Sequence, residues 1–198
     1  MSNVRILFLG PVDSPVLRYL ERVERELSAT PEPIALETLE DERPDFIVCH
    51  GYRHIIGGDV LARLPDRIVN LHISLLPWNR GADPNVWSFL EDTPRGVTVH
   101  YVDAGIDTGD VIVQKAVEFG PDETLRTSYG RLQEELARLF TDHWPAIREG
   151  RCARRPQEPG GSAHRIRDLD AVRHLLIQGW DTPVSKLVGQ ARASGSVV

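Results

Sequence analysis

The stretch that decides the fold reads Val69-Asn70-Leu71-His72-Ile73-Ser74-Leu75-Leu76-Pro77. Successive side chains of a strand point to opposite faces, so Asn70 and His72 share one face and their apolar neighbours occupy the other. Pro77 disfavours a helical conformation of the residue before it, so we expect the strand to end in a rigid loop. Ligands of open α/β sheets bind beyond the carboxyl ends of the strands. The amide and the imidazole are therefore expected at a ligand site.

A second decisive stretch is the glycine-bracketed loop Gly105-Ile106-Asp107-Thr108-Gly109. It separates strand-like runs at 97–102 and 111–117, which predicts a hairpin with Asp107 held at its turn. Glycines allow backbone conformations that other residues avoid, so the loop can hold the carboxylate at a fixed point beside the amide and the imidazole. We interpret His100, in the first of these runs, as a paired sheet residue rather than a second base.

An amide, an imidazole and a carboxylate together suit acyl transfer without a covalent intermediate. A positioned amide donates to a carbonyl oxygen as that oxygen becomes an oxyanion. A neutral imidazole accepts or relays a proton near neutral pH, and a carboxylate can orient it or hold a proton-shuttling water. The chain has no serine or cysteine in a G-x-S-x-G nucleophile pattern. We therefore expect the acyl group to pass directly from donor to acceptor.

These residues belong to a longer set of motifs, which are Asn70-x-His72-x-Ser74-Leu75-Leu76-Pro77, Arg80-Gly81, Gly96-Val97-Thr98 and Asp103-x-Gly105-Ile106-Asp107-Thr108-Gly109-Asp110. The set resembles the catalytic core of the 10-formyltetrahydrofolate-dependent formyltransferases. That family includes glycinamide ribonucleotide transformylase, methionyl-tRNA formyltransferase and the sugar N-formyltransferases. The resemblance extends over about residues 44–150. It implies 10-formyltetrahydrofolate as the formyl donor, no metal, and a catalytic triad of Asn70, His72 and Asp107.

The resemblance also implies roles for residues around the triad. The residues that it assigns to the folate are Tyr52, Arg53, His54, Ile55, Ile56, Gly105 and Ile106. Those that it assigns to the acceptor substrate are Ser74, Trp78 and Arg80. Packing of a surface loop is the alternative role for Trp78 and Arg80.

The order of strand and helix patterns predicts the fold. A buried-strand pattern at 4–10 ends in a glycine and is followed by a helical apolar stripe over 14–29, which is how a Rossmann-like sheet begins. The other expected elements are strands at 31–36 and 45–50, helices at 37–43, 59–64, 84–91 and 171–178, and a long amphipathic helix from about 122 to 148. We expect an α/β fold with a Rossmann-like formyltransferase core, in which a mostly parallel sheet carries helices on both faces.

The order of these elements and the composition of the segments between them predict the domain boundaries. We expect a formyltransferase catalytic domain over 1–150, with a shortened N-terminal part, and a short C-terminal extension over 151–198. The arginine-containing segment that begins this extension is polar and rich in proline and glycine, which is typical of a solvated linker. The small, polar tail from about 191 is expected to be disordered.

Composition excludes several classes of function. The net charge is −6, so the chain lacks the excess of cations with which nucleic-acid-binding proteins neutralise phosphates. Cys49 and Cys152 form neither a metal spacing nor a disulfide framework, which is typical of a reducing cytoplasm. His50 and His54 would share a face only on a helix, so we expect no metal site. No apolar run reaches membrane-spanning length and the first strand begins at once, so we expect a cytoplasmic protein without a signal peptide.

The acceptor is inferred by elimination among relatives. Residues 149–198 are too few for the C-terminal barrel that methionyl-tRNA formyltransferases add, and Gly10-Pro11 is a poor phosphate cradle because proline has no N–H. The resemblance therefore favours a primary amine of a nucleotide-linked amino-deoxysugar. Alternatives are a 10-formyltetrahydrofolate hydrolase, transfer to another small amine such as glycinamide ribonucleotide, and an idle folate- or nucleotide-sugar-binding protein. A homodimer is compatible with the sequence.

Overall fold

The computed structural model describes residues 4–193 of the chain. By its internal contacts the chain forms two compact units, and each is discontinuous in sequence. The first unit takes the residues up to His72, Val99–Val113 and Ala137–Pro156. The second takes Ile73–Thr98, Gln114–Leu136 and the residues from Gln157 onward. Within residues 4–193, every helix is too short or too polar to cross a bilayer.

The strands are β1 Arg5–Leu9, β2 Glu26–Thr30, β3 Phe46–His50, β4 Ile68–His72, β5 Arg80–Gly81, β6 Gly96–Tyr101, β7 Val111–Ala116 and β8 Ala163–His164. The α-helices are α1 Pro15–Val23, α2 Leu36–Glu42, α3 Gly58–Arg63, α4 Pro84–Leu90, α5 Leu125–Arg148, α6 Leu169–Val172 and α7 Gln190–Ala193. Short 3-10 turns lie at Ile166–Asp168, Arg173–Leu175, Gly179–Asp181 and Val184–Lys186.

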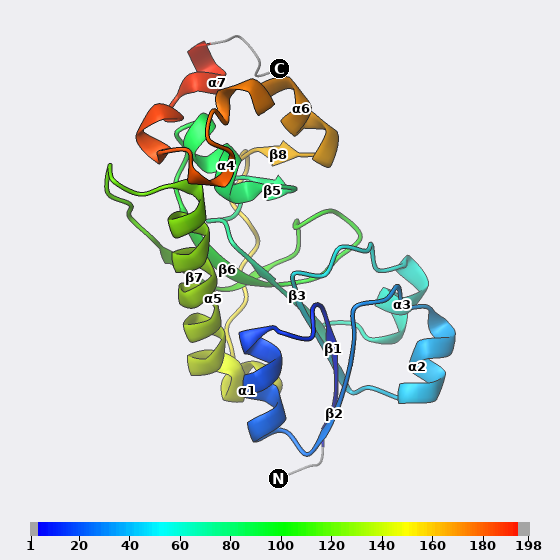
Figure 1. The fold of residues 1–198 in the computed structure, drawn as a ribbon. Helices are drawn as coiled ribbons and strands as arrows, with labels where there is room; N and C mark the ends of the chain where they lie inside the picture. The colour runs from blue at the N-terminus through cyan, green and yellow to red at the C-terminus, as the bar shows by residue number, and fades with distance from the viewer. Residues whose placement is uncertain (1–3, 194–198) are drawn as a thin grey trace. The chain divides into compact units, whose positions relative to one another are not determined.

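A six-stranded sheet in the order β2-β1-β3-β4-β6-β7 forms the framework. Strand β1 pairs in parallel with β2 and β3, and β3 pairs in parallel with β4 (Figure 1). The register sets Cys49 beside Asn70. Strands β6 and β7 are neighbours, as the predicted hairpin requires. The predicted α/β fold with a mostly parallel sheet is therefore confirmed.

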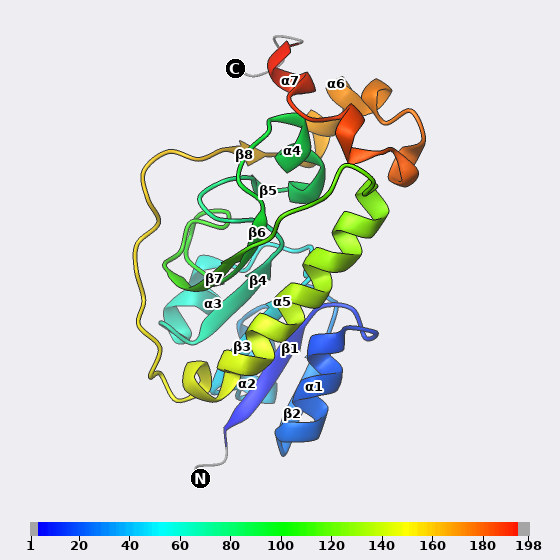
Figure 2. The same cartoon turned by 90° about the vertical axis from the view of Figure 1, so that its left-hand side faces the viewer.

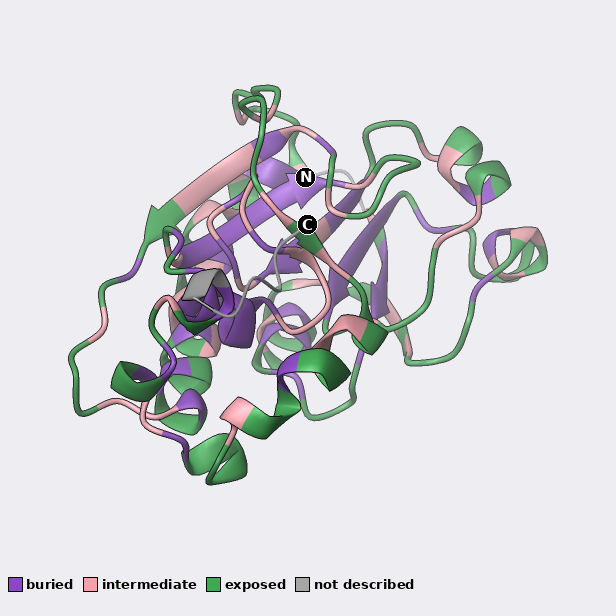
Figure 3. Cartoon of the chain, turned by 90° about the horizontal axis from the view of Figure 1, so that it is seen from above, coloured by how far each residue is buried: buried purple, intermediate pink, exposed green. Residues whose placement is uncertain are grey.

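Helices cover both faces of the sheet in the first unit. On one face, α1 packs against the last part of α5, where the Tyr19 hydroxyl donates to the Thr141 carbonyl over 3.3 Å (Figure 2). The Phe46 ring of β3 meets the Trp144 ring edge-on on this face, with centroids 5.5 Å apart. On the other face, Leu39 of α2 and Val60 of α3 join the apolar side chains of β1, β3 and β4. Every residue of β3 is consequently buried, which explains the apolar run that precedes His50 (Figure 3).

The second unit has a core of its own. All residues of α4 are buried, and Val86, Trp87, Phe89 and Leu90 form a cluster with apolar residues from α5 and from the C-terminal extension. The other buried members of the cluster are Leu125, Val172, Val184, Leu187 and Ala191. The C-terminal extension therefore completes an apolar core. The domain division at residue 150 stays a prediction.

The predicted helix over 14–29 is wrong beyond Val23. Val23 is 47% exposed, and the chain turns extended at Glu24, whose carboxylate accepts the Trp144 indole N–H over 2.7 Å. Leu27 lies in β2 opposite Ile6, so the second strand is at 26–30 and the predicted strand at 31–36 is absent from the described residues. A contact 120 residues away in sequence thus ends the helix.

Two expectations near the C-terminus also need correction. The helix predicted at 171–178 is replaced by α6 and the 3-10 turn Arg173–Leu175. Disorder from residue 191 is wrong for 191–193, because they lie in α7 and Ala191 is buried. Residues 194–198 lie outside the described residues.

Candidate active site

The structure brings the three predicted catalytic residues together within the first unit. Strand β4 carries Asn70 and His72, and the β6–β7 loop carries Asp107. Asn70 Nδ2 donates to Asp107 Oδ1 over 3.0 Å, and His72 Nδ1 lies 3.6 Å from Asp107 Oδ2. The side chains of His72 and Asp107 are 9% and 13% exposed, so the group is largely shielded from water. One carboxylate thus orients both the amide and the imidazole.

His100 of β6 is a fourth member of the group. It is 1% exposed, and its Nε2 lies 3.3 Å from Asn70 Nδ2 and 3.4 Å from Asp107 Oδ1. Its Nδ1 lies 2.8 Å from the Tyr101 carbonyl oxygen, which can only accept, so Nδ1 carries a proton. In the neutral ring Nε2 is then an acceptor for the Asn70 amide. The interpretation of His100 as a plain sheet residue was incomplete, because its ring belongs to the site.

The Asn70 amide is fully engaged by this arrangement. A side-chain amide has two N–H donors, and here one faces Asp107 Oδ1 while the other faces His100 Nε2. The predicted role of Asn70 as an oxyanion donor therefore requires one of these bonds to be exchanged for the substrate. The bond to His100 is the longer one, and catalytic hydrogen bonds commonly rearrange when substrate binds.

The loop that presents Asp107 has an unusual backbone. Asp107 itself takes the left-handed conformation, with φ 52°, which a non-glycine residue adopts at some cost and which is common at functional sites. The flanking glycines are needed for another reason, because neighbouring atoms lie where a side chain would begin. A Cβ on Gly105 would lie 2.0 Å from Thr108 Oγ1, and one on Gly109 would lie 1.9 Å from a backbone carbonyl oxygen. Asp103 closes the loop by accepting from the Gly105 N–H and the Thr108 hydroxyl.

The arginine-containing linker holds the hairpin in place. Arg154 donates from Nε to Asp110 over 2.8 Å and from its Nη1 to Asp66, and its guanidinium lies over the Tyr101 ring at 4.7 Å. These carboxylate partners, Asp66 first, raise the pKa of Arg154. Residues 111 and 155 also exchange two backbone hydrogen bonds, at 2.8 and 3.0 Å. The linker is therefore tied to the hairpin rather than simply solvated.

The residues predicted to bind folate all lie in the first unit. Tyr52 is tied back by a hydrogen bond from its hydroxyl to the Glu32 carbonyl, and it packs with Ile56 against the core. Burial raises the pKa of Tyr52. Ile55 and Ile106 are instead 83% and 59% exposed, which leaves apolar surface for a flat ligand. Arg53, His54 and Gly105 are exposed as well. Their contact with folate stays a prediction.

The residues predicted to bind the acceptor lie in the second unit. Ser74 is buried, and its hydroxyl has no hydrogen-bond partner in the described part of the chain. Trp78 is half-buried. Arg80 is half-buried, and its Nε donates to Gln157 over 3.0 Å. Their contact with a substrate also stays a prediction.

The remaining candidate ligands and nucleophiles have structural roles. His50 Nδ1 lies 2.8 Å from the hydroxyl of Ser14, the residue that caps α1. Cys49 is buried, and burial raises the pKa of its thiol, so the thiol is neither a thiolate nucleophile nor a ready metal ligand. Over residues 4–193, no three His, Cys, Asp or Glu side chains are grouped so as to hold a metal ion.

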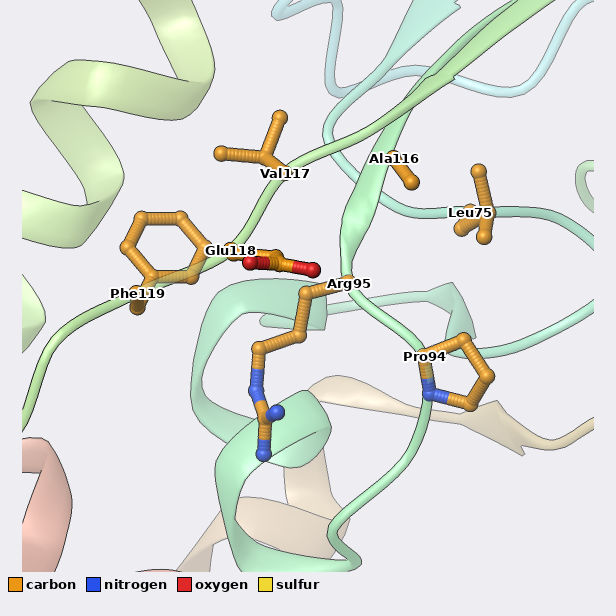
Figure 4. A pocket seen from close by; sticks show the side chains of 7 residues that line it. All are labelled: Leu75, Pro94, Arg95, Ala116, Val117, Glu118 and Phe119. Carbon is orange, nitrogen blue, oxygen red and sulfur yellow. The ribbon is translucent and has the colours of Figure 1, made fainter.

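A surface hollow of about 370 Å³ lies in the second unit (Figure 4). Apolar side chains make most of its lining, and the charged groups of Arg95 and Glu118 border it. Arg95 is engaged elsewhere, because it donates to Asp92 and its guanidinium lies over the Phe89 ring. None of the predicted site residues lines this hollow.

Fold and site together define an α/β protein with an Asn–His–Asp group suited to acyl transfer. The family model described as formyl transferase matches residues 11–143. A methionyl-tRNA formyltransferase of Desulforamulus reducens is 33% identical over 122 residues, which cover 61% of this chain and 38% of that protein. One of Syntrophus aciditrophicus is 35% identical over 134 residues, which cover 67% and 43%. This chain thus spans less than half the length of these curated relatives.

A solved structure matches over nearly the whole chain. The formyltransferase PseJ from Anoxybacillus kamchatkensis, in complex with UDP-4,6-dideoxy-4-formamido-L-AltNAc and tetrahydrofolate, is 47% identical with a TM-score of 0.90. The match covers 94% of this chain and 99% of that one. The chain described here belongs to the formyl transferase family, as its motifs predicted.

Proposed function

We propose that this chain transfers a formyl group from 10-formyltetrahydrofolate to the primary amine of a nucleotide-linked amino-deoxysugar. The observation that carries the proposal is the convergence of Asn70, His72 and Asp107 within 3.0 to 3.6 Å. The acceptor class is supported by PseJ, whose bound UDP-sugar carries a 4-formamido group and which is 47% identical to this chain.

The residues of the site divide the chemistry between them. When bound, 10-formyltetrahydrofolate supplies an activated formyl carbon. Attack by the amine nitrogen forms the new C–N bond and places negative charge on the formyl oxygen, while the bond from the formyl carbon to the folate nitrogen breaks. The Asn70 amide stabilises that oxygen. The proton lost by the amine passes to Nε2 of His72, directly or through a water, and from there to the folate nitrogen as it leaves.

Asp107 sets the protonation pattern of the imidazole. Its Oδ2 lies 3.6 Å from His72 Nδ1, and a negative group there favours the tautomer with a proton on Nδ1 and an accepting Nε2. Its Oδ1 faces Asn70 and His100. The exposed side chains of Ile55 and Ile106 fit a flat pterin, because they offer apolar surface, and Ile106 is next to Asp107 in the loop.

The test is a screen of amino-sugar nucleotides and other amines with 10-formyltetrahydrofolate, read by the mass gain of one formyl group. Asn70→Ala, His72→Ala and Asp107→Ala should each abolish transfer and leave thermal unfolding cooperative. His174→Ala is the matched control, because His174 is exposed and lies outside the site. If two of the three site variants keep their turnover, the assignment of these residues as catalytic is refuted. Formate release without any amine would indicate hydrolysis instead.

A further inference from the structure

Arg80 has a backbone fixed by the C-terminal extension. In the two-stranded sheet of the second unit, β5 pairs in parallel with β8. The Arg80 N–H donates to the Ser162 carbonyl, and the Ala82 N–H donates to the His164 carbonyl, both over 2.9 Å. A Cβ on Gly81 would lie 2.3 Å from the His164 carbonyl oxygen, so the two segments are in close contact.

The residue before Arg80 is held as firmly. Asn79 is fully buried with φ 54°, its N–H donates to Ser162 Oγ over 3.0 Å, and its side-chain amide donates to Thr93 over 2.8 Å. A left-handed conformation persists at a non-glycine residue only where the surroundings fix it. Arg80 is therefore presented in one direction before any ligand binds.

The Arg80 guanidinium is oriented but not neutralised. Its Nε donates to the Gln157 side-chain oxygen over 3.0 Å, and its terminal nitrogens have no partner within residues 4–193. Several other arginines of the second unit are paired with acids, such as Arg126, which donates twice to Asp181 at 2.7 and 3.2 Å. An amide oxygen at residue 157 holds the guanidinium plane without cancelling its charge, as a carboxylate there would.

We propose that Arg80 binds a phosphate group of the nucleotide-linked acceptor, and that Gln157 is the positioning residue for its guanidinium. This proposal rests on the proposed function. The planar fork of terminal N–H groups matches two oxygens of one phosphate, which a lysine cannot do. Gln157 lies outside residues 11–143, which the family model matches. The residue that positions the Arg80 guanidinium therefore comes from the C-terminal extension of this chain.

The experiment compares binding of UDP and uridine by calorimetry to the full chain without folate. The variants are Arg80→Ala, Arg80→Lys, Gln157→Ala and the double variant Arg80→Ala/Gln157→Ala. Arg167→Ala is the control, because it removes the same charge from an exposed side chain of the extension. Thermal unfolding of each variant separates loss of fold from loss of binding.

The wild-type chain should bind UDP more tightly than uridine. Arg80→Ala should weaken UDP binding by roughly ten- to a hundredfold, as expected for a charge-assisted hydrogen-bonded contact, with uridine binding unchanged. Arg80→Lys should lose less. Gln157→Ala should lose part of the same preference at unchanged thermal stability, and the double variant should be no weaker than Arg80→Ala alone, since Gln157 acts through Arg80.

Other outcomes overturn the proposal in separate ways. The contact between Arg80 and a phosphate is refuted if the wild type binds UDP and uridine equally. It is also refuted if Arg80→Ala keeps the wild-type preference for UDP. The positioning role of Gln157 is refuted if the losses of UDP affinity in the two single variants add up in the double variant. Because these measurements use no formyl donor, they are independent of turnover, whereas a wild-type chain that formylates no amino sugar would refute the proposed function itself.

Discussion

Replacing Asp107 by asparagine tests whether one carboxylate organises the whole site. Asparagine has the same shape and tolerates a left-handed φ as well as aspartate does, so φ 52° can be kept. The change replaces one carboxylate oxygen by an NH₂ group. If that group faces His72, the imidazole must accept at Nδ1 and moves its proton to Nε2. If it faces Asn70, two donors oppose each other where a 3.0 Å bond now lies.

Both outcomes remove transition-state stabilisation while leaving the fold intact. A wrong imidazole tautomer costs up to about four orders of magnitude in known triads, and loss of a charge-assisted hydrogen bond costs roughly 1.5–3 kcal/mol. We therefore expect kcat/KM for formyl transfer to fall by roughly two to four orders of magnitude, or about 3–5 kcal/mol of barrier. Thermal unfolding should change little, because the loop keeps its glycines and its Asp103 contacts.

The assay is steady-state formyl transfer read by mass spectrometry, with Asp103→Asn as the matched control. Asparagine at 103 still offers an oxygen to the Gly105 N–H and the Thr108 hydroxyl, so this variant of the same loop should keep most of its activity. If Asp107→Asn retains more than a tenth of wild-type kcat/KM, the carboxylate does not set the imidazole tautomer, and the division of roles given above is wrong.

Three further predictions concern stability. Arg154→Ala should lower the free energy of unfolding by about 1 kcal/mol or less per lost exposed ion pair, and added salt should shrink the difference in chemical denaturation. Gly109→Ala should destabilise strongly because its Cβ would lie 1.9 Å from the Tyr101 carbonyl oxygen, whereas Gly120→Ala, with open space around it, should not. The pKa of Glu123 is lowered, chiefly by a threonine hydroxyl that donates to it, so its contribution to stability is present above its ordinary pKa of 4.5 and lost as pH falls through the lowered value. Denaturation of wild type and Glu123→Gln should therefore differ at neutral pH and converge in acid.

Local patterns in the sequence predicted those features that depend on neighbours along the chain. The alternation around Asn70 and His72 predicted a strand with both side chains on one face, and the structure brings both to Asp107. The bracketing glycines predicted a tight loop, although Asp107 rather than a glycine takes the positive φ.

Features that depend on distant parts of the chain were beyond local reasoning. The end of α1 is set by Glu24, whose partner Trp144 lies 120 residues later. The contact between Arg80 and Gln157 spans 77 residues. The sequence offered one indication for His100, which lies on one face of its strand as Asn70 lies on one face of its own. Only the pairing of β4 with β6 brings these two faces side by side.

That pairing also shows why the Asp107 loop must be so tightly built. The Val102 N–H donates to the Ile68 carbonyl over 2.9 Å, so the end of β6 lies beside the start of β4. The loop leaves from that point, yet Asp107 reaches Asn70, which is two residues further along β4. The loop must therefore fold back along the strand, and a left-handed residue with glycines in close contact on either side permits such a reversal. The carboxylate is consequently positioned by loop geometry, whereas the amide and the imidazole are positioned by the pleat of a strand.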